Sequence, residues 1–148
     1  MKFKVYLLIL FFSLIIFTLY GQAENRDNKT LKFKHFSIAE GLSQSSVLEI
    51  LQDNKGFLWF GTRDGLNKYD GHSFKTFRHN SMDPYSISNS YIKTLLQDEQ
   101  GTLWVGTNYG LNRYLTEDDR FDRIYFANDN TNGANNEIWD IVSDDKEN

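Results

Sequence analysis

Residues 53–69 read DNKGFLWFGTRDGLNKY, and residues 98–114 read DEQGTLWVGTNYGLNRY. Both stretches belong to a longer match without gaps, in which residues 42–69 align with residues 87–114 at an offset of 45 and about half of the positions are identical. A repeat of this length is typical of β-propellers, in which each repeat forms one four-stranded blade. The repeat therefore predicts an all-β fold.

The residues that the two copies share have structural explanations. The first copy opens with residues 53–56, a short segment that starts with Asp and ends with Gly, and the second copy does the same. Such segments favour hairpin turns, because Asp accepts hydrogen bonds from the turn backbone and Gly adopts positive φ. The apolar residues that follow predict central strands, with Trp59 and Trp104 in the core between blades. We expect Gly61 and Gly106 to let the chain bend at strand ends.

Further apolar segments complete the blades. A fourth strand is expected at 74–77 after the first copy and at 121–124 after the second. Residues 33–36 resemble a fourth strand without its blade, and residues 138–142 resemble the first strand of another blade. We therefore predict a β-propeller with about two complete four-stranded blades, an N-terminal closing strand and the start of a third blade. Since rings typically have about four to eight blades, we expect the chain to be an N-terminal fragment of a longer protein.

The N-terminus predicts export. Lys2 and Lys4 precede an apolar run over 5–19, and residues 21–23 place small residues where signal peptidase cleaves. The alternative is an uncleaved anchor helix, although the apolar run is shorter than the roughly 20 residues that span a bilayer. The predicted organisation is a signal peptide at 1–23, a polar tail at 24–30, the closing strand and a loop at 31–46, blade one at 47–77, a loop at 78–91, blade two at 92–126, and a loop with the first strand of a truncated third blade at 127–148. We expect the exported part to be periplasmic.

Composition supports this fold and excludes several functions. The chain has 12 Phe, 8 Tyr and 3 Trp against a single Pro, which favours strands over helices. A net charge of -4 without a basic stripe in the exported part leaves no electrostatic basis for nucleic-acid binding. The absence of Cys excludes disulfides, Cys-ligated zinc and thiol nucleophiles.

No pattern in the sequence indicates catalysis, a metal or a cofactor. The three histidines, His35, His72 and His79, fall on or beside predicted outer strands and do not converge in the repeat frame. Residues 128–133 faintly resemble a calcium loop, but Trp139 stands where the bidentate Glu belongs. The acidic clusters at 117–119 and 144–145 are interpreted as solvated turns. We expect this chain not to be an enzyme.

The repeated pattern D-x-x-G-x-L-W-x-G-T-x-x-G-L-x-x-Y, which follows Gly41-Leu42-Ser43 in the first copy, closely resembles the two-component regulator propeller repeat. The resemblance covers residues 31 to about 145, nearly the whole exported part. It implies a periplasmic sensor propeller of a hybrid two-component histidine kinase, whose membrane helix and kinase would belong to a longer parent protein. It also implies oligosaccharide ligands, and the partners would be the remaining blades, the signalling domains and a second copy in a homodimer.

In a propeller, the connections after the second and fourth strands of each blade emerge on one face, where ligands can bind. The predicted binding residues on this face are Arg63, Asp64, Asn108, Tyr109, Gln44 and Asn89. Aromatic, amide and charged groups suit sugar stacking and hydrogen bonding to hydroxyls, although Ser, Asn and Gly also serve turns. Ser43 and Ser88 recur in both copies, so we interpret them as structural. A surface interaction propeller and, less favoured, a carbohydrate-active enzyme fragment stay open as alternative functions.

Overall fold

The structure, a computed structural model, describes residues 31–126 and 136–144. The predicted signal peptide, the polar tail and the calcium-like segment at 128–133 lie outside these residues. Contacts divide the chain into two units, Met1–Lys34 and His35–Asn148, and the described strands all lie in the second. They are β1 Val47–Gln52, β2 Leu58–Thr62, β3 Gly65–Tyr69, β4 Phe74–Phe77, β5 Ile92–Gln97, β6 Leu103–Thr107, β7 Gly110–Leu115 and β8 Arg120–Ile124. A short 3-10 helix, η1 Ile38–Glu40, precedes them.

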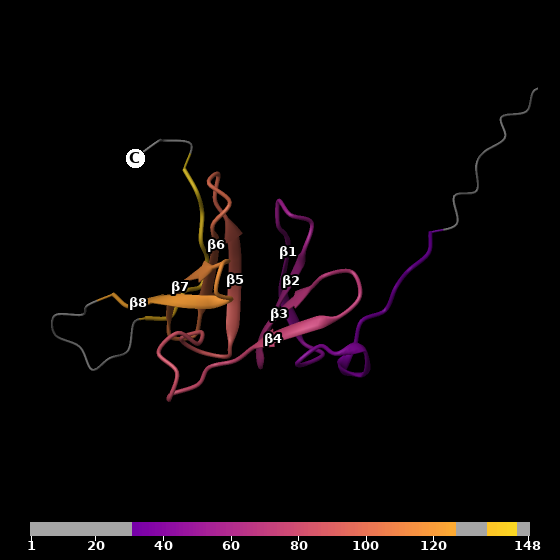
Figure 1. The fold of residues 1–148 in the computed structure, drawn as a ribbon, viewed down its shortest axis with the longest axis horizontal. Coiled ribbons are helices and arrows are strands. Elements are labelled where there is room, and N and C mark those ends of the chain that lie inside the picture. The colour runs from indigo at the N-terminus through magenta and orange to yellow at the C-terminus, as the bar shows by residue number, and fades with distance from the viewer. Residues whose placement is uncertain (1–30, 127–135, 145–148) are drawn as a thin grey trace, which may run out of the picture. The chain divides into compact units, whose positions relative to one another are not determined.

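The strands form two four-stranded antiparallel sheets, ordered β1-β2-β3-β4 and β5-β6-β7-β8 (Figure 1). Each sheet is an up-and-down meander, and each has the same register shift in its first strand, between Val47 and Glu49 and between Ile92 and Thr94. The two copies of the sequence repeat therefore fold into two copies of one unit. The predicted all-β fold with four strands per repeat is confirmed.

The Asp-to-Gly segments form hairpin turns, as predicted. One oxygen of Asp53 accepts hydrogen bonds from the backbone of Lys55 and Phe57, while the other accepts from Nε1 of Trp59 at 2.8 Å. Gly56 closes the turn with a φ of 87°. In the second sheet Asp98 repeats these contacts, and each Asp thereby joins its turn to the strand that follows.

We expect Asp98→Asn to destabilise the chain by about 1.5–3 kcal/mol, the usual value of a hydrogen bond to a charged group. Asp98 uses one oxygen for the Thr102 N–H and the other for Trp104 Nε1, both at 2.7 Å. In asparagine an NH2 group replaces one of these oxygens and cannot accept its bond, so one of the two bonds is lost. Burial raises the pKa of Asp98, but the bonds from Trp104 and Thr102 outweigh it and lower the pKa below 3.8. This stabilisation is present above the unfolded pKa and is lost as the pH falls through the folded pKa. Urea unfolding from neutral to acidic pH should show a shallower acid loss in the variant, and an unchanged profile would contradict the prediction.

The main core lies between the two sheets. Trp59 of β2 is 1% exposed, with its ring centroid 4.9 Å from that of Tyr114 in the second sheet and 6.1 Å from that of Phe77 in its own. Trp59 is thus an inter-blade core residue, as predicted. Trp104 occupies the same position in β6 but is only half-buried, because no third sheet covers it among the described residues.

Gly61 and Gly106 allow close packing between successive repeats. Both glycines lie near the ends of β2 and β6 and are paired with both neighbouring strands, and the bend expected there stays a prediction. A Cβ at either glycine would lie 2.8 Å from an isoleucine Cγ2, of Ile92 at Gly61 and of Ile138 at Gly106. Contacts this short are not tolerated, so each glycine makes room for an isoleucine from the next repeat.

Residues 136–144, which include the predicted first strand of a third blade, contact blade two through a hydrogen bond that has a counterpart in blade one. The Gly65 N–H donates to the Ser90 carbonyl at 2.7 Å, which joins blade one to the approach to β5, and the Gly110 N–H donates to the Asn136 carbonyl at 2.6 Å. Asn136, the first residue of the segment 136–144, is therefore bonded to blade two in the same way as Ser90, just before β5, is bonded to blade one. Residues 136–144 form no strand in the described chain.

Residues 31–37 also form no helix or strand, so the closing strand expected at 33–36 is not seen. In the second unit, the Phe36 ring packs on Phe60, Tyr69 and Phe74 with centroids 4.8–5.8 Å apart. A closing strand needs a partner strand in the last blade of a ring, and only two sheets are present in the described residues. The closing role of this segment stays a prediction.

Asp119 differs from the solvated charge expected of the cluster at 117–119. It adopts a left-handed φ of 53° and accepts hydrogen bonds from Tyr114 in its own blade and from Lys75 Nζ of blade one at 2.6 Å. Burial raises its pKa, but these two bonds and the nearby Lys68 lower it below the ordinary value. Asp119 thus links the two blades, whereas Glu117 and Asp118 are exposed as expected.

Candidate functional site

The β2–β3 and β6–β7 turns lie at the same end of the sheets as the segments that lead into β1 and β5. The Arg63 N–H donates to Oε1 of Gln44 at 3.2 Å, and the Asn108 N–H donates to the Tyr91 carbonyl at 3.0 Å. We call this surface the turn face and define it as Gln44, Arg63, Asp64, Arg78, Asn89, Tyr91, Asn108, Tyr109 and Tyr125. All six predicted binding residues lie on it.

The other hairpins lie at the opposite end of the strands. They contain Asp53 and Lys55 between β1 and β2, and Glu99 and Gln100 between β5 and β6. The structure therefore separates the predicted binding residues from these four residues, and each of the four can serve as a control position.

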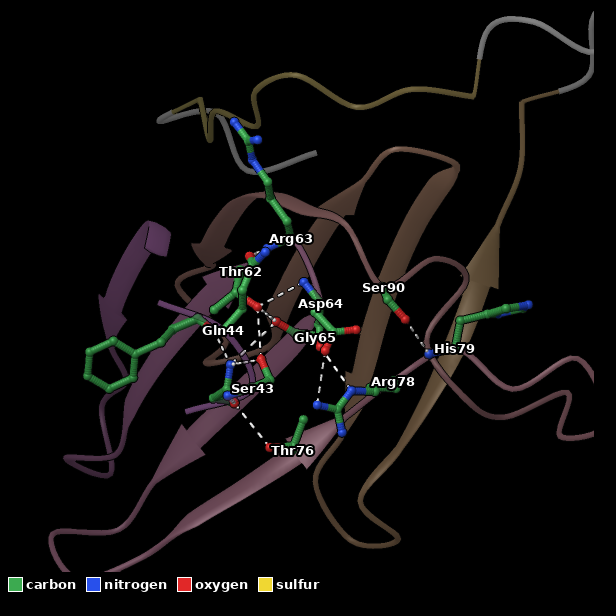
Figure 2. Close-up of polar contacts among 12 residues, drawn as sticks. Ser43, Gln44, Thr62, Arg63, Asp64, Gly65, Thr76, Arg78, His79 and Ser90 are labelled. Carbon is green, nitrogen blue, oxygen red and sulfur yellow. Dashed lines mark hydrogen bonds and ion pairs between the residues drawn. The ribbon is translucent and has the colours of Figure 1, made fainter. Parts of the chain in front are cut away.

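A buried polar network supports the turn face in blade one (Figure 2). The Asn67 amide accepts from the Ser43 N–H at 2.9 Å and donates to Oγ of Ser43 at 2.9 Å and to the Phe60 carbonyl at 3.2 Å. Thr62 Oγ1 lies 2.9 Å from the Ser43 hydroxyl and accepts from the Asp64 N–H at 3.1 Å. These bonds connect the turn between β2 and β3 to the segment that leads into β1.

Blade two repeats the network with Asn112, Ser88 and Thr107, whose amide and hydroxyl contacts are between 2.8 and 3.1 Å. Asn112 and Thr107 are fully buried, and no buried side-chain nitrogen or oxygen in the described residues lacks a partner. Ser43 and Ser88 are therefore structural residues. The network makes the turn face a rigid support for the exposed side chains above it.

The Arg63 side chain points away from the residues of this network in Figure 2, and it is exposed. Its guanidinium carbon lies 5.7 Å from the centroid of the Tyr91 ring, within reach of a cation–π interaction. No carboxylate of the described residues pairs with it. Arg63 is therefore placed to bind an acceptor group on a ligand.

Asp64 is less available, because Arg78 engages it twice. Nη2 of Arg78 lies 3.1 Å from Oδ2 of Asp64, and Nε donates to the Asp64 carbonyl at 3.1 Å (Figure 2). Both side chains are about half exposed, so a ligand can reach the pair but has to compete with it.

The two asparagines among the predicted residues differ. Oδ1 of Asn89 accepts from the Tyr91 N–H at 2.8 Å, which is a turn-forming contact and leaves its amide NH2 for other partners. Asn108 is exposed at the β6–β7 turn, and Tyr109 beside it is 44% exposed. Turn formation thus explains why an asparagine occurs at position 89, but it does not explain the aromatic ring at position 109.

Sequence reasoning missed three residues of the turn face, Arg78, Tyr91 and Tyr125. Tyr91 aligns with Ser46 at the offset of 45, so the difference between copies that singled out Arg63 and Tyr109 also marks it. Arg78 and Tyr125 follow directly after the residues that pair with Leu66 and Leu111. They are 47 positions apart, because the paired Tyr114 and Phe121 enclose two more residues than the paired Tyr69 and Phe74. A fixed offset of 45 therefore does not align them.

No cluster of three or more His, Cys, Asp or Glu side chains placed to bind a metal ion occurs in residues 31–126 and 136–144. The three histidines are dispersed, and Nδ1 of His79 lies 3.0 Å from the Ile87 carbonyl. Within the same residues, no helix is long and apolar enough to cross a membrane.

Comparison with protein families matches the model described as two component regulator propeller at residues 41–64 and again at 86–109. The chain carries two-component regulator propeller repeats. Each matched segment runs from the approach to the first strand of a blade to the turn after its second strand, so it includes the network residues Ser43 and Thr62 and their copies. The predicted resemblance is confirmed.

Known proteins with similar segments include a histidine kinase and the extracellular domains of two bacterial signalling systems. Histidine kinase P4 of Formosa agariphila is 52% identical over 77 residues, which is 52% of this chain and 6% of that protein. The extracellular domain of the protein described as hybrid two component system BT3049 of B. thetaiotaomicron aligns with a TM-score of 0.55 at 37% identity, over 61% of this chain and 13% of the other. The extracellular domain of BT4673 from the same organism, at 23% identity and a TM-score of 0.51 over 64% of this chain and 14% of the other, is similar in fold. This chain thus spans between 6% and 14% of the length of these proteins.

Proposed function

We propose that this chain is the N-terminal part of an extracellular propeller that senses a ligand for a two-component receptor. The observation that carries the proposal is the pair of regulator propeller repeats, together with the likeness to the extracellular domain of BT3049. The remaining blades, a membrane helix and a histidine kinase would belong to the longer protein. The signal peptide at 1–23 would deliver the propeller to the periplasm. The receptor would act as a homodimer.

The ligand of the sensor is an oligosaccharide in this proposal. Arg63, Asn108 and Tyr109 present a guanidinium, an amide and an aromatic ring to solvent on one rigid face. Such groups bind sugars by hydrogen bonds to hydroxyls and by stacking on C–H faces. In this proposal the segment binds the sugar without converting it.

Calorimetry on the full-length protein with a panel of short neutral, uronate and sulfated oligosaccharides tests the proposal. We expect at least one sugar to bind and Arg63→Ala to weaken its binding by about 1–2 kcal/mol, the scale of one lost stacking or hydrogen-bond contact. Lys55→Ala, at the opposite end of the same blade, should leave binding unchanged. Weaker binding in the Lys55 variant alone would place the site on the other face, and a sugar released as cleaved product would favour an enzyme over a sensor.

A further inference from the structure

Two positions on the turn face come together in both blades. One is the second residue of the turn after the second strand, Asp64 or Tyr109, and its N–H donates to the preceding threonine hydroxyl at 3.1 Å in each blade. The other is the first residue after the fourth strand, Arg78 or Tyr125. The two positions are in contact in both blades, although the blades carry different side chains there.

The side chains at the two positions differ between the blades. In blade one they form the Asp64–Arg78 ion pair at 3.1 Å (Figure 2). In blade two Tyr109 and Tyr125 form an aromatic pair, with ring centroids 5.5 Å apart and planes tilted by 47°. Since the ion pair is compatible with the same backbone, the fold does not require aromatic rings at this place.

The two tyrosines are also unusually exposed for aromatic residues of these sheets. Tyr109 is 44% and Tyr125 45% exposed, and the next residue, Phe126, is 51% exposed, whereas Tyr69, Tyr114 and Phe121 are buried. Exposed aromatic rings that gather at one place on a surface mark a binding site. The Tyr125 ring also lies close over Gly110, where an added Cβ would be 3.0 Å from Cε1 of Tyr125.

We propose that Tyr109 and Tyr125 form a stacking subsite for a pyranose ring at the end of blade two. Two rings at an angle offer two apolar surfaces to the C–H groups of one sugar. Their phenol hydroxyls bond no other residue in the described part of the chain and can bond the hydroxyl groups of the sugar. Asn108, adjacent in the turn, adds an exposed amide. This inference rests on the proposed sensing of oligosaccharides and assigns to it a site that includes Tyr125, at the end of the fourth strand.

Exchange of the pair between the blades is the sharpest test. The double variant Tyr109→Asp with Tyr125→Arg places the ion pair of blade one in blade two, so the backbone has a precedent for accepting it. In calorimetry on the full-length protein with the best-binding sugar of the panel, we expect about tenfold weaker binding, which corresponds to about 1.4 kcal/mol. Tyr125→Phe keeps the stacking surface and should stay within about threefold of the wild type. Gln100→Ala, an exposed position at the opposite end of blade two, should leave binding unchanged.

The outcomes separate the two proposals. If the wild type binds a sugar and the double variant binds it equally well, the stacking subsite is wrong and the sensing proposal stands. If Gln100→Ala weakens binding as much as the double variant does, the loss does not come from the tyrosine pair and the inference is also wrong. Failure of the wild type to bind any sugar of the panel would contradict oligosaccharide sensing itself. Thermal unfolding of each variant shows whether a loss of binding comes from a loss of fold.

Discussion

Replacement of Trp59 by Ala should lower the free energy of unfolding by about 3–5 kcal/mol, the range for truncating a buried aromatic side chain. The ring is 1% exposed and fills the space between the two sheets, next to Phe77 and Tyr114. Its removal would leave a cavity between the blades and would leave Oδ2 of Asp53 without the Nε1 donor at 2.8 Å. Urea unfolding of the chain, followed by far-UV circular dichroism, measures the change.

Two controls accompany this measurement. Lys55→Ala, at an exposed position of the adjacent turn, should change stability by no more than about 0.5 kcal/mol. Trp104→Ala should cost less than Trp59→Ala, because Trp104 makes the same bond to its Asp but is only half-buried. Equal and small effects at Trp59 and Lys55 would mean that the sheets do not pack through Trp59, contrary to the structure.

The period of the repeat carried most of the fold prediction. Turns were predictable because Asp and Gly occupy fixed positions in both copies, and their side chains and φ angles act locally. The difference in burial between Trp59 and Trp104 was not predictable, because the similar sequences around them do not show whether a neighbouring sheet covers each residue. The role of Gly61 was missed for the same reason, since it depends on Ile92 of the next blade.

The candidate site was predictable where its residues lie inside the gapless part of the repeat. Arg63 stands where the second copy has Asn108, and Tyr109 stands where the first copy has Asp64. These differences between the copies singled the two residues out from the sequence alone. Tyr125 and Arg78 lie beyond the turn before the fourth strand, where the two copies differ in length, and their relation is visible only in the strand register. The inter-blade contacts of Asp119 were hidden as well, because its partner Lys75 lies 44 residues away in blade one.

Asn112→Ala should destabilise the chain by about 2–4 kcal/mol, because it removes several buried hydrogen bonds at once and leaves partners unsatisfied. The Asn112 amide is fully buried, accepts from the Ser88 N–H at 2.8 Å and donates to Oγ of Ser88 at 2.9 Å and to the Val105 carbonyl at 3.1 Å. Alanine can replace none of these contacts. The lost stability should appear in urea unfolding as a lower midpoint with an unchanged slope.

Asn108→Ala is the matched control, because it removes the same amide from an exposed position four residues away in the same blade. It should change stability by no more than about 0.5 kcal/mol. Asn67→Ala should resemble Asn112→Ala, since Asn67 makes the corresponding bonds to Ser43 and Phe60. If Asn112→Ala were as mild as Asn108→Ala, the network would not hold the turn to the approach of the first strand. The rigid support of Tyr109 and Arg63, on which binding at the turn face depends, would then need another source.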